Sequence, residues 1–470
     1  MARVITQAEM GIIASITLLT SLIQIIVNLG LNSSIAKFIS ESMGRGADYS
    51  KYVISALALR IPLTLAITSQ IVIFSTYLSI TLFNTPKYSN ILSLAAVDIA
   101  LLSINPLLNN TLLGSGKLKE MAVYGVSSVM IRWVSITAFL YKGFVLTGVV
   151  YGWITGDSAL LIMLLISTSK SINFQKNLLS QSIVLLPSML KFSWPIYIGS
   201  ITTFLYTWYD KALILAFLSL EQLGIYNIAY MPFSVLASIA ASLGSSLLPY
   251  YGIMYGKNNH KAISEGIKRA SKYTMLIMFP LALGLAATAK PVITLFAGQQ
   301  YESGWPVLAT LAIFGLVYGL SPAFSNLLLI YGKTKTILLL NLISVASSLT
   351  LLPLILLLNL TGLAIVKGAS LLITFILSIY YISKIVKIEV NTSTATKTLI
   401  SSLTMAITVL ATQQLLQNKI LLPLHVLIGA ITYTSIIRRM KILNEEDVQL
   451  IKGIFGEKIA RNIAKIMNIQ

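Results

Sequence analysis

Seven ionisable residues stand inside long apolar stretches of the sequence, where charges are unusual. They are Arg60, Asp98, Arg132, Asp157, Asp210, Lys211 and Lys367. A charge at the middle of a bilayer costs about 2.5–3.5 kcal/mol unless it is paired or faces water, so such residues often serve a function. Basic side chains can bind a phosphate in place of water, and carboxylates can hold a coupling ion or pair with a cation.

The four basic residues of this set are candidates for binding an anionic ligand in a cationic cavity. Arg132 and Lys367 lie deep within their apolar stretches. Arg60 and Lys211 lie about two turns from helix ends, from which long side chains can reach the membrane surface. A purely structural role is therefore the alternative for these two.

The three acidic residues, Asp98, Asp157 and Asp210, are candidates for ion coupling or for charge pairs. Asp98 and Asp157 stand in the same half of the chain as Arg132. A structural ion pair with Arg132 is therefore the alternative to an ion-coupling role for them.

No pattern in the sequence predicts catalysis, a metal site or a cofactor. The segment Gly114-Ser-Gly116-Lys117 lacks the full spacing of a phosphate-binding loop and the strand that precedes one. The chain has no cysteine, and its two histidines, His260 and His425, stand in different segments. We therefore predict no catalytic residue, no metal ligand and no cofactor.

The composition indicates an all-α polytopic membrane protein. Of the 470 residues 56% are hydrophobic and 10% are charged, and the mean hydropathy is +0.83. Soluble proteins have about 25% charged residues. Long apolar runs recur along the chain and predict about 13 helices that span the membrane.

The net charge of +19 could indicate binding to nucleic acid or to an anionic membrane surface. Most of the 34 lysines and arginines fall in alternate loops and in the C-terminal tail. Because basic loops stay on the cytoplasmic side, this distribution predicts a cytoplasmic C-terminus and removes the need for a nucleic-acid partner.

An internal repeat predicts two pseudo-symmetric lobes. Pro106-x-x-x-Asn110 followed by Gly116-Lys117-x-Lys119 recurs as Pro322-x-x-x-Asn326 followed by Gly332-Lys333-x-Lys335, and Thr147-Gly148 recurs as Thr361-Gly362 at nearly the same offset. Parallel repeats of this kind usually form two lobes with the substrate site between them.

The repeat also predicts that one helix is missing. A helix from Phe192 precedes the one that begins near Gly224, whereas the counterpart near Gly11 has only ten residues before it. We therefore expect the first lobe to lack a counterpart of the helix from Phe192, and a natural variant with 13 helices is the alternative.

The predicted domains follow from these patterns. They are an N-terminal lobe of about five helices over 1–168, a cytoplasmic or interfacial linker over 169–191, a second lobe of about six helices over 192–388, two additional transmembrane helices over 389–440, and an amphipathic cytoplasmic helix over 441–470. In the last segment Asn444-Glu-Glu-Asp447 can cap a helix. Apolar residues from Val448 to Ile466 then recur at helical spacing among lysines, which suits an anionic membrane surface or a docking partner.

Several short motifs resemble one known family. Phe192-Ser-x-Pro195, Asp210, Ser219-x-Glu221-x-x-Gly224-x-Tyr226, Leu248-Pro249 and Leu295-Phe-Ala-Gly298 are similar to motifs of the polysaccharide-biosynthesis flippases for O-antigen and other lipid-linked oligosaccharides. These flippases belong to the superfamily that also holds multidrug exporters and lipid II flippases. The resemblance implies two lobes of six helices plus two further helices.

The resemblance also implies a function. It implies a plasma-membrane flippase, not an enzyme, that moves a polyprenyl phosphate- or pyrophosphate-linked oligosaccharide from the cytoplasmic to the outer leaflet. Its partners would be the lipid-linked glycan, membrane lipids and glycosyltransferases or a polymerase. Sugar hydroxyls would add polar contacts, for which the candidates are Asn110, Asn326, Tyr206 and Tyr230. Helix packing is the alternative for the two asparagines.

Two other functions remain open on the sequence. A cation-coupled multidrug exporter of the same superfamily would use membrane carboxylates such as Asp98 and Asp157. A membrane scaffold for glycan assembly, without transport, would suit a chain that lacks its first helix. The number of basic residues in the apolar stretches favours the flippase.

Overall fold

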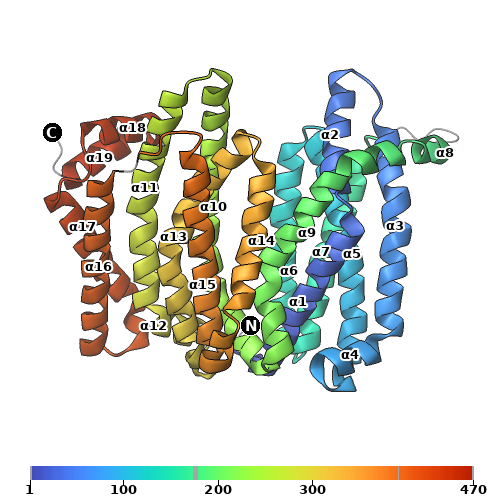
Figure 1. Ribbon diagram of the computed structural model, residues 1–470. Helices are drawn as coiled ribbons and strands as arrows, with labels where there is room; N and C mark the ends of the chain where they lie inside the picture. Colours follow the sequence, from blue (N-terminus) through green and yellow to red (C-terminus); the bar gives the residue numbers. More distant parts are fainter. Residues whose placement is uncertain (1–2, 173–177, 390, 468–470) are drawn as a thin grey trace. The chain divides into compact units, whose positions relative to one another are not determined.

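The computed structural model describes residues 3–172, 178–389 and 391–467, and every regular element within these ranges is helical (Figure 1). Twelve helices of the described chain are long and apolar enough to cross a membrane. The protein is therefore a multi-pass membrane protein, because helices satisfy their backbone hydrogen bonds within hydrocarbon. The sequence predicted about 13 apolar helices, and the remaining apolar run forms the shorter, 17-residue helix α14 (Thr334–Thr350).

Contacts divide the chain into two compact units, Met1–Gly224 and Ile225–Gln470. The elements up to the end of the first unit are α1 (Gln7–Asn28), α2 (Leu31–Gly44), α3 (Ser50–Ile73), α4 (Ser75–Phe83), η1 (Pro86–Tyr88), α5 (Ser89–Gly114), α6 (Leu118–Tyr141), α7 (Leu146–Ser169), α8 (Leu178–Ile183) and α9 (Leu186–Phe217). The remaining elements are α10 (Leu220–Gly256), α11 (His260–Ala287), α12 (Ala289–Phe296), η2 (Gln299–Gly304), α13 (Trp305–Ile330), α14, α15 (Pro353–Ser383), α16 (Thr392–Leu415), η3 (Lys419–Leu421), α17 (Leu422–Arg439), α18 (Glu445–Phe455) and α19 (Glu457–Met467).

The two units repeat one packing order. In the first unit α3 packs on α5, and both α5 and α6 pack on α7. In the second unit α11 packs on α13, and both α13 and α14 pack on α15. The internal repeat that the sequence predicted is thus present in the helix packing.

The repeated Gly-Lys motif forms the same turn in both units. Gly116 and Gly332 have φ of 73° and 67°, a conformation that glycine adopts without steric cost. The next amide closes each turn, with Lys117 N donating to Leu112 O at 2.9 Å and Lys333 N to Leu328 O at 2.8 Å. The motif therefore ends one apolar helix and starts the next in each repeat.

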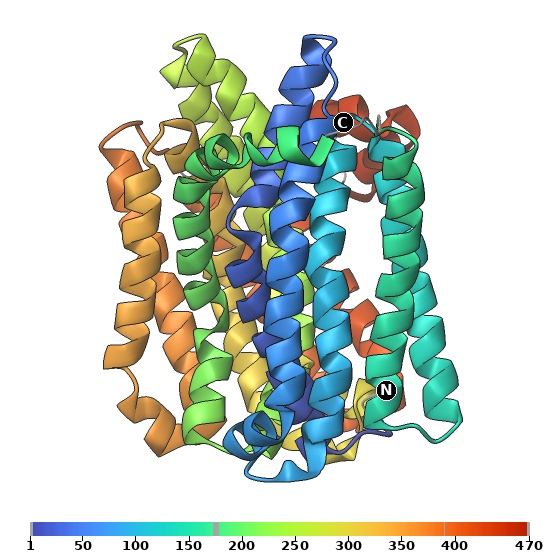
Figure 2. The same cartoon turned by 90° about the vertical axis from the view of Figure 1, so that its right-hand side faces the viewer.

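The segment between the repeats is more helical than the sequence predicted. The predicted linker over 169–191 contains α8, and α9 begins at Leu186 rather than near Phe192. Residues 173–177 of that linker lie outside the described residues. Figures 1 and 2 show α8 lying across the ends of the spanning helices of its unit. Because α9 packs on α1 and α2, contacts assign it to the first unit, and the domain limits based on the repeat stay a prediction.

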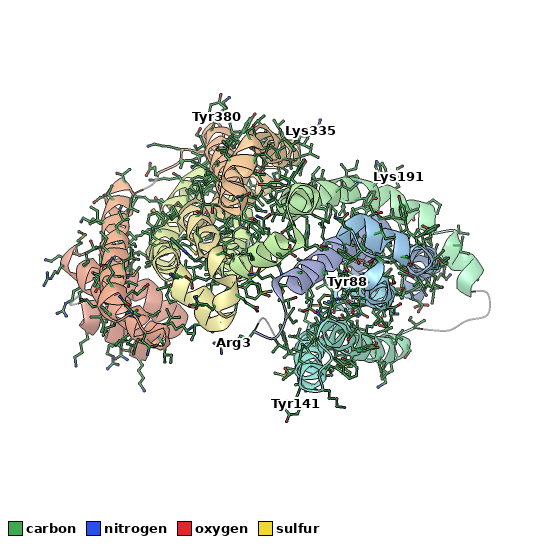
Figure 3. The ribbon with its side chains drawn as sticks, turned by 90° about the horizontal axis from the view of Figure 1, so that it is seen from below. Arg3, Tyr88, Tyr141, Lys191, Lys335 and Tyr380 are labelled. Carbon is green, nitrogen blue, oxygen red and sulfur yellow. The ribbon has the colours of Figure 1, made fainter. Side chains whose placement is uncertain are left out.

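Helix α6 lies at the edge of its unit and is held mainly by α7. Ser128 and Ile136 are the buried residues of α6, whereas Trp133 and Val134 are exposed, as expected for a surface that faces lipid. Tyr141, the last residue of α6, points outward in the view along the helices (Figure 3).

Three glycines one turn apart bring α6 and α7 together. A Cβ at Gly152 would lie 2.3 Å from Cγ1 of Ile136, and one at Gly156 would lie 2.6 Å from Cβ of Arg132. Gly148 meets Phe139 in the same way at 3.0 Å. Small residues at this spacing let transmembrane helices approach closely, so side chains of α6 pack directly on the backbone of α7 along this seam.

The C-terminal tail forms two helices instead of the single predicted one. Gly456, with φ of 85°, separates α18 from α19. The predicted cap at Asn444 is confirmed, because Asn444 and Asp447 exchange hydrogen bonds as a capping box. The apolar side chains at 451, 455, 459, 463 and 466, on which the amphipathic prediction relied, lie outside the described side chains.

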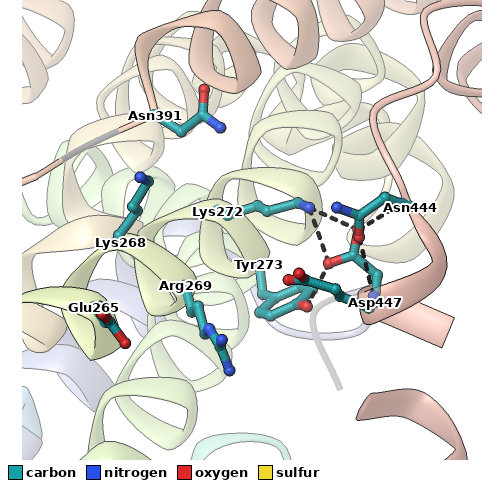
Figure 4. A pocket seen from close by; sticks show the side chains of 9 residues that line it. Glu265, Lys268, Arg269, Lys272, Tyr273, Asn391, Asn444 and Asp447 are labelled. Carbon is teal, nitrogen blue, oxygen red and sulfur yellow. Dashed lines mark hydrogen bonds and ion pairs between the residues drawn. The ribbon is translucent and has the colours of Figure 1, made fainter. Parts of the chain in front are cut away.

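Asp447 fixes the start of α18 to α11 (Figure 4). Its carboxylate accepts hydrogen bonds from Lys272 Nζ at 2.6 and 2.9 Å and from the hydroxyl of Tyr273 at 2.5 Å. It also accepts the backbone N–H of Asn444 at 2.7 Å. Asp447 is buried, so this fully bonded carboxylate attaches the tail to a spanning helix.

We expect Gly152→Ala to lower thermal stability, because the added methyl group would force α6 away from α7. Overpacking of this kind costs about 1–3 kcal/mol. The matched control is Gly125→Ala in α6, where a Cβ would meet open space and where alanine favours the helix. Unfolding midpoints in detergent should fall for Gly152→Ala alone, and an equal midpoint for both variants would contradict the close approach.

Asp447→Ala should release the tail, because it leaves Lys272 and Tyr273 without their shared acceptor. Removing one member of a buried ion pair costs about 3–5 kcal/mol. Trypsin should then cut faster at Lys452, Lys458 and Arg461 than in the unaltered chain. Glu446→Ala, an exposed acid next to Asp447, is the control and should leave the cleavage rate unchanged. Equal rates in both variants would show that Asp447 does not hold the tail.

Candidate functional site

Three of the predicted residues form a charge cluster in the first unit. Nη2 of Arg132 in α6 lies 2.9 Å from Oδ2 of Asp157 in α7 and 3.9 Å from Oδ2 of Asp98 in α5. The side chains of Asp98 and Asp157 are 3% and 9% exposed, against 30% for Arg132. Both acids thus lie beside Arg132, as the ion-pair alternative expected.

The neighbouring residues position this cluster. Gly156 brings the backbone of α7 against Arg132, so that the next residue, Asp157, faces the guanidinium. Nδ2 of Asn105 in α5 donates to the main-chain oxygen of Asp157 at 3.0 Å. The ring of Trp153 in α7 lies 5.6 Å from Cζ of Arg132, within the range of a cation–π contact.

Arg60 is buried among neutral acceptors. Its Nη1 donates to the carbonyl of Ser103 at 3.1 Å, and its Nη2 donates to the side chains of Asn28 and Asn32 at 3.0 and 2.9 Å. Nη2 also reaches the carbonyl of Asn28 at 3.3 Å, where α1 ends. The negative end of the α1 dipole thus helps to neutralise the charge.

Arg60 also marks a break in the first spanning segment. After Asn28, Leu29 and Gly30 have φ of 47° and 75°, so the chain turns before α2 begins. A Cβ at Gly30 would lie 2.5 Å from the carbonyl oxygen of Ser193. Because Arg60 is 1% exposed, it does not reach the membrane surface, and its contacts favour the structural role.

Lys211 is also buried, at 6% exposure. It therefore does not reach the membrane surface, which its position in the sequence would have permitted. Its Nζ lies 4.6 Å from the ring of Trp208, within α9. Asp210 is buried beside it and accepts the backbone N–H of Lys211 at 3.0 Å. A lysine against an aromatic ring gains a favourable electrostatic contact with the face of that ring.

The second unit contains a comparable lysine. Lys367 in α15 is 4% exposed, and its Nζ lies 5.6 Å from the ring of Tyr230 in α10. Tyr230 contacts the rings of Tyr226 and Phe233, and Phe233 contacts Tyr318, with ring centroids 5.6 to 6.0 Å apart. Each unit therefore places one buried lysine beside an aromatic ring.

The asparagines proposed for sugar contact bond to backbone instead. Nδ2 of Asn110 donates to the carbonyl of Pro106 at 2.8 Å, and Nδ2 of Asn326 donates to the carbonyl of Gly244 in α10 at 2.7 Å. Both contacts fit the packing alternative. The hydroxyl groups of Tyr206 and Tyr230 stay candidates for sugar contact.

A separate cavity of about 380 Å³ lies beside the tail in the second unit (Figure 4). It is lined by Glu265, Lys268, Arg269, Lys272, Tyr273, Asn391, Asn444, Glu446 and Asp447. Lys272 pairs with Asp447, and Lys268 lies 3.8 Å from Glu389. A hydrogen bond from Lys387 and its charge hold the pKa of Glu389 below its usual value. Because carboxylates balance these cations, we do not assign the cavity to an anionic ligand.

Sequence reasoning missed the residues that support the charge cluster. The Gly148, Gly152 and Gly156 spacing was a readable signal for close helix packing. No signal in the sequence indicated Asn105, Trp153 or Trp208 as neighbours of the charged residues. Among the described residues, no group of three or more His, Asp or Glu side chains is placed to hold a metal ion.

Solved structures of transporters share this fold. The inward closed conformation of the lipid II flippase MurJ matches with a TM-score of 0.70 and 16% identity, over 92% of this chain and 96% of that chain. An inward-facing multidrug resistance transporter of the MATE family, in the MOP superfamily, matches with a TM-score of 0.58 and 16% identity, over 80% of this chain and 91% of that chain. The fold class predicted from the sequence is thus confirmed.

Sequence comparison agrees with this fold. The chain is 24% identical over 440 residues to the probable low-salt glycan biosynthesis flippase Agl15 of Haloferax volcanii. The matched region covers 93% of this chain and 90% of that protein. It is 30% identical over 125 residues to the teichuronic acid biosynthesis protein TuaB of Bacillus subtilis, about 26% of each chain. The profile of the polysaccharide biosynthesis protein family matches residues 1–306. The chain therefore belongs to the polysaccharide biosynthesis protein family.

Proposed function

We propose that this protein is a flippase that moves a lipid-linked oligosaccharide from the cytoplasmic to the outer leaflet of the plasma membrane. The carrier would be a polyprenyl phosphate or pyrophosphate. The observation that carries the proposal is the burial of Lys211 and Lys367 inside spanning helices of a chain that is similar over 93% of its length to a glycan flippase.

Buried lysines beside aromatic rings suit the head group of such a substrate. The phosphate loses its hydration when it leaves water, and fixed cations replace the lost contacts. The rings of Trp208 and Tyr230, which lie against these lysines, offer apolar faces on which sugar rings can pack. The polyprenyl tail stays in lipid, so the protein needs polar groups for the head group only.

The other two cations receive different roles in this proposal. Arg132 shares its charge with Asp98 and Asp157, and Arg60 holds the end of α1. We assign Lys211 and Lys367 to the head group because both are buried within spanning helices and lie beside aromatic rings.

The repeated fold supports a cycle of alternating access in which transport, rather than catalysis, is the activity. Glycosyltransferases or a polymerase of the same pathway are the partners that this role implies.

The carboxylates of the charge cluster favour one competing function. A cation-coupled multidrug exporter would use Asp98 and Asp157 to carry its coupling ion, and the fold is shared with such exporters. Transport of a hydrophobic cation by reconstituted protein, without movement of a lipid-linked glycan, would favour the exporter.

Lys367→Ala should slow the movement of a lipid-linked oligosaccharide by about tenfold to a hundredfold. A hydrogen bond to a charged group contributes about 1.5–3 kcal/mol, and every 1.4 kcal/mol is about a factor of ten. The assay would follow a fluorescent polyprenyl pyrophosphate oligosaccharide in liposomes. Lys367→Arg should retain most of the rate because it keeps the charge. Lys387→Ala, an exposed lysine, is the control, and an equal rate for the control and Lys367→Ala would overturn the assignment.

The chain should lie in the membrane with its C-terminal tail in the cytoplasm. Because it contains no cysteine, single cysteines can report the side directly. A membrane-impermeant maleimide should label Lys142→Cys, in the turn between α6 and α7, in intact cells. It should label Lys458→Cys, in α19, only after the membrane is permeabilised. The reverse labelling pattern would invert the orientation and the direction of transport that we propose.

A further inference from the structure

We propose that Asp98, Asp157 and Arg132 form a proton-binding site, in which the two carboxyl groups share one proton and exchange it during transport. The proton site itself stands on the geometry of the first unit. Its coupling to transport rests on the proposed function. The site would let a pH gradient drive the movement of the lipid-linked substrate.

Charge balance requires the proton. One guanidinium can neutralise one carboxylate, and a second ionised carboxylate would leave a net negative charge inside a spanning bundle. An unbalanced charge at that depth costs about 2.5–3.5 kcal/mol. Both acids are almost fully buried, so water cannot replace the missing cation. A single shared proton makes the three groups neutral together.

Few other charges surround the site. Asp98 is the only charged residue of α5, and Asp157 is the only one of α7. The rest of α6 has its charges at the start of the helix, at Lys119 and Glu120. Other elements that pack on α5 carry Glu9, Lys37, Glu41, Lys51, Arg60 and Lys87. Of these, Arg60 contacts α5 at Ser103, and its donors are bound to Asn28, Asn32 and that carbonyl.

The geometry also favours a proton between the two acids. Oδ2 of Asp98 and Oδ2 of Asp157 lie 3.9 and 2.9 Å from the same nitrogen, Nη2 of Arg132, so the two carboxyl groups are close together around one cation. Two ionised carboxylates repel at that separation, whereas a protonated carboxyl donates to its neighbour. Oδ1 of Asp98 is buried, and no described side chain donates to it. An ionised carboxylate with an unbonded buried oxygen is costly, and protonation lowers that cost.

Arg132 gives the site a way to exchange its proton. Its side chain is 30% exposed while its Nη2 contacts Asp157, so it extends from the buried pair to the surface of the unit. Movement of the guanidinium away from Asp157 would favour proton uptake, and its return would favour release. Because α6 is held mainly by α7, a small shift between these two helices is enough to change this contact.

Infrared spectroscopy of the purified protein tests the proton without any substrate. At neutral pH we expect a carboxylic acid C=O band that is lost in both Asp98→Asn and Asp157→Asn. Either change leaves one carboxylate beside the guanidinium of Arg132. The charges of these two groups cancel, so no proton is needed. Glu41→Gln, at an exposed acid, is the control and should keep the band. Absence of the band from the unaltered protein would overturn the site, whether or not the variants fold.

Transport in liposomes tests the coupling. Flipping by the unaltered protein should change with an imposed pH difference, by up to about tenfold for one unit. In Asp98→Asn the rate should no longer respond to the gradient, while Glu41→Gln should respond normally. Flipping that ignores the gradient in the unaltered protein would overturn the coupling even if the band is present. If no glycan is flipped at all, the proposed function fails, and the infrared result still decides the proton site.

Discussion

The cost of placing a charge in hydrocarbon determines much of this structure. The four cations within the spanning helices have stabilising contacts of three kinds. Arg132 meets two carboxylates, Arg60 meets carbonyl and amide oxygens at the end of a helix, and Lys211 and Lys367 lie against aromatic rings. Both arginines thus bind oxygen acceptors of their own unit, and both lysines gain a cation–π contact with an aromatic ring.

The Arg132 cluster depends on how closely two helices approach. Hydrophobic burial does not drive association between helices in lipid, so packing and polar contacts must do so. Gly152 and Gly156 remove the side chains that would separate α6 from α7, and the ion pair of Arg132 with Asp157 joins the same two helices. Close packing and charge pairing therefore support each other along one seam. A change in the protonation of the acids would act directly on the contact that holds α6 in place.

The sequence predicted the features that repeat or recur with a regular period. Apolar runs predicted the spanning helices, and the Pro-Asn-Gly-Lys motif predicted a repeat whose turns at Gly116 and Gly332 are nearly identical. Charge and position alone offered the pairing of Arg132 with Asp98 and Asp157 as one of two alternatives. Contacts between distant segments could not be predicted in this way. Nothing in the sequence brings Ser103 and Asn28 to Arg60, and the break at Gly456, although a glycine marks it, was overlooked because the apolar spacing continues through it.

The repeat is symmetric in its fold but not in its charges. The alignment of Pro106 with Pro322 places Phe314 at the position of Asp98. The alignment of Thr147 with Thr361 places Leu371 at the position of Asp157. In the second unit Phe314 packs closely on Gly368 of α15, so an apolar contact replaces the charge cluster. Conversely, the position of Lys367 corresponds to Trp153. Duplication explains the shared helix packing, while the different charges suit the two units to different roles. The carboxylate pair of the first unit suits a proton, and the lysine beside aromatic rings in the second suits an anionic head group.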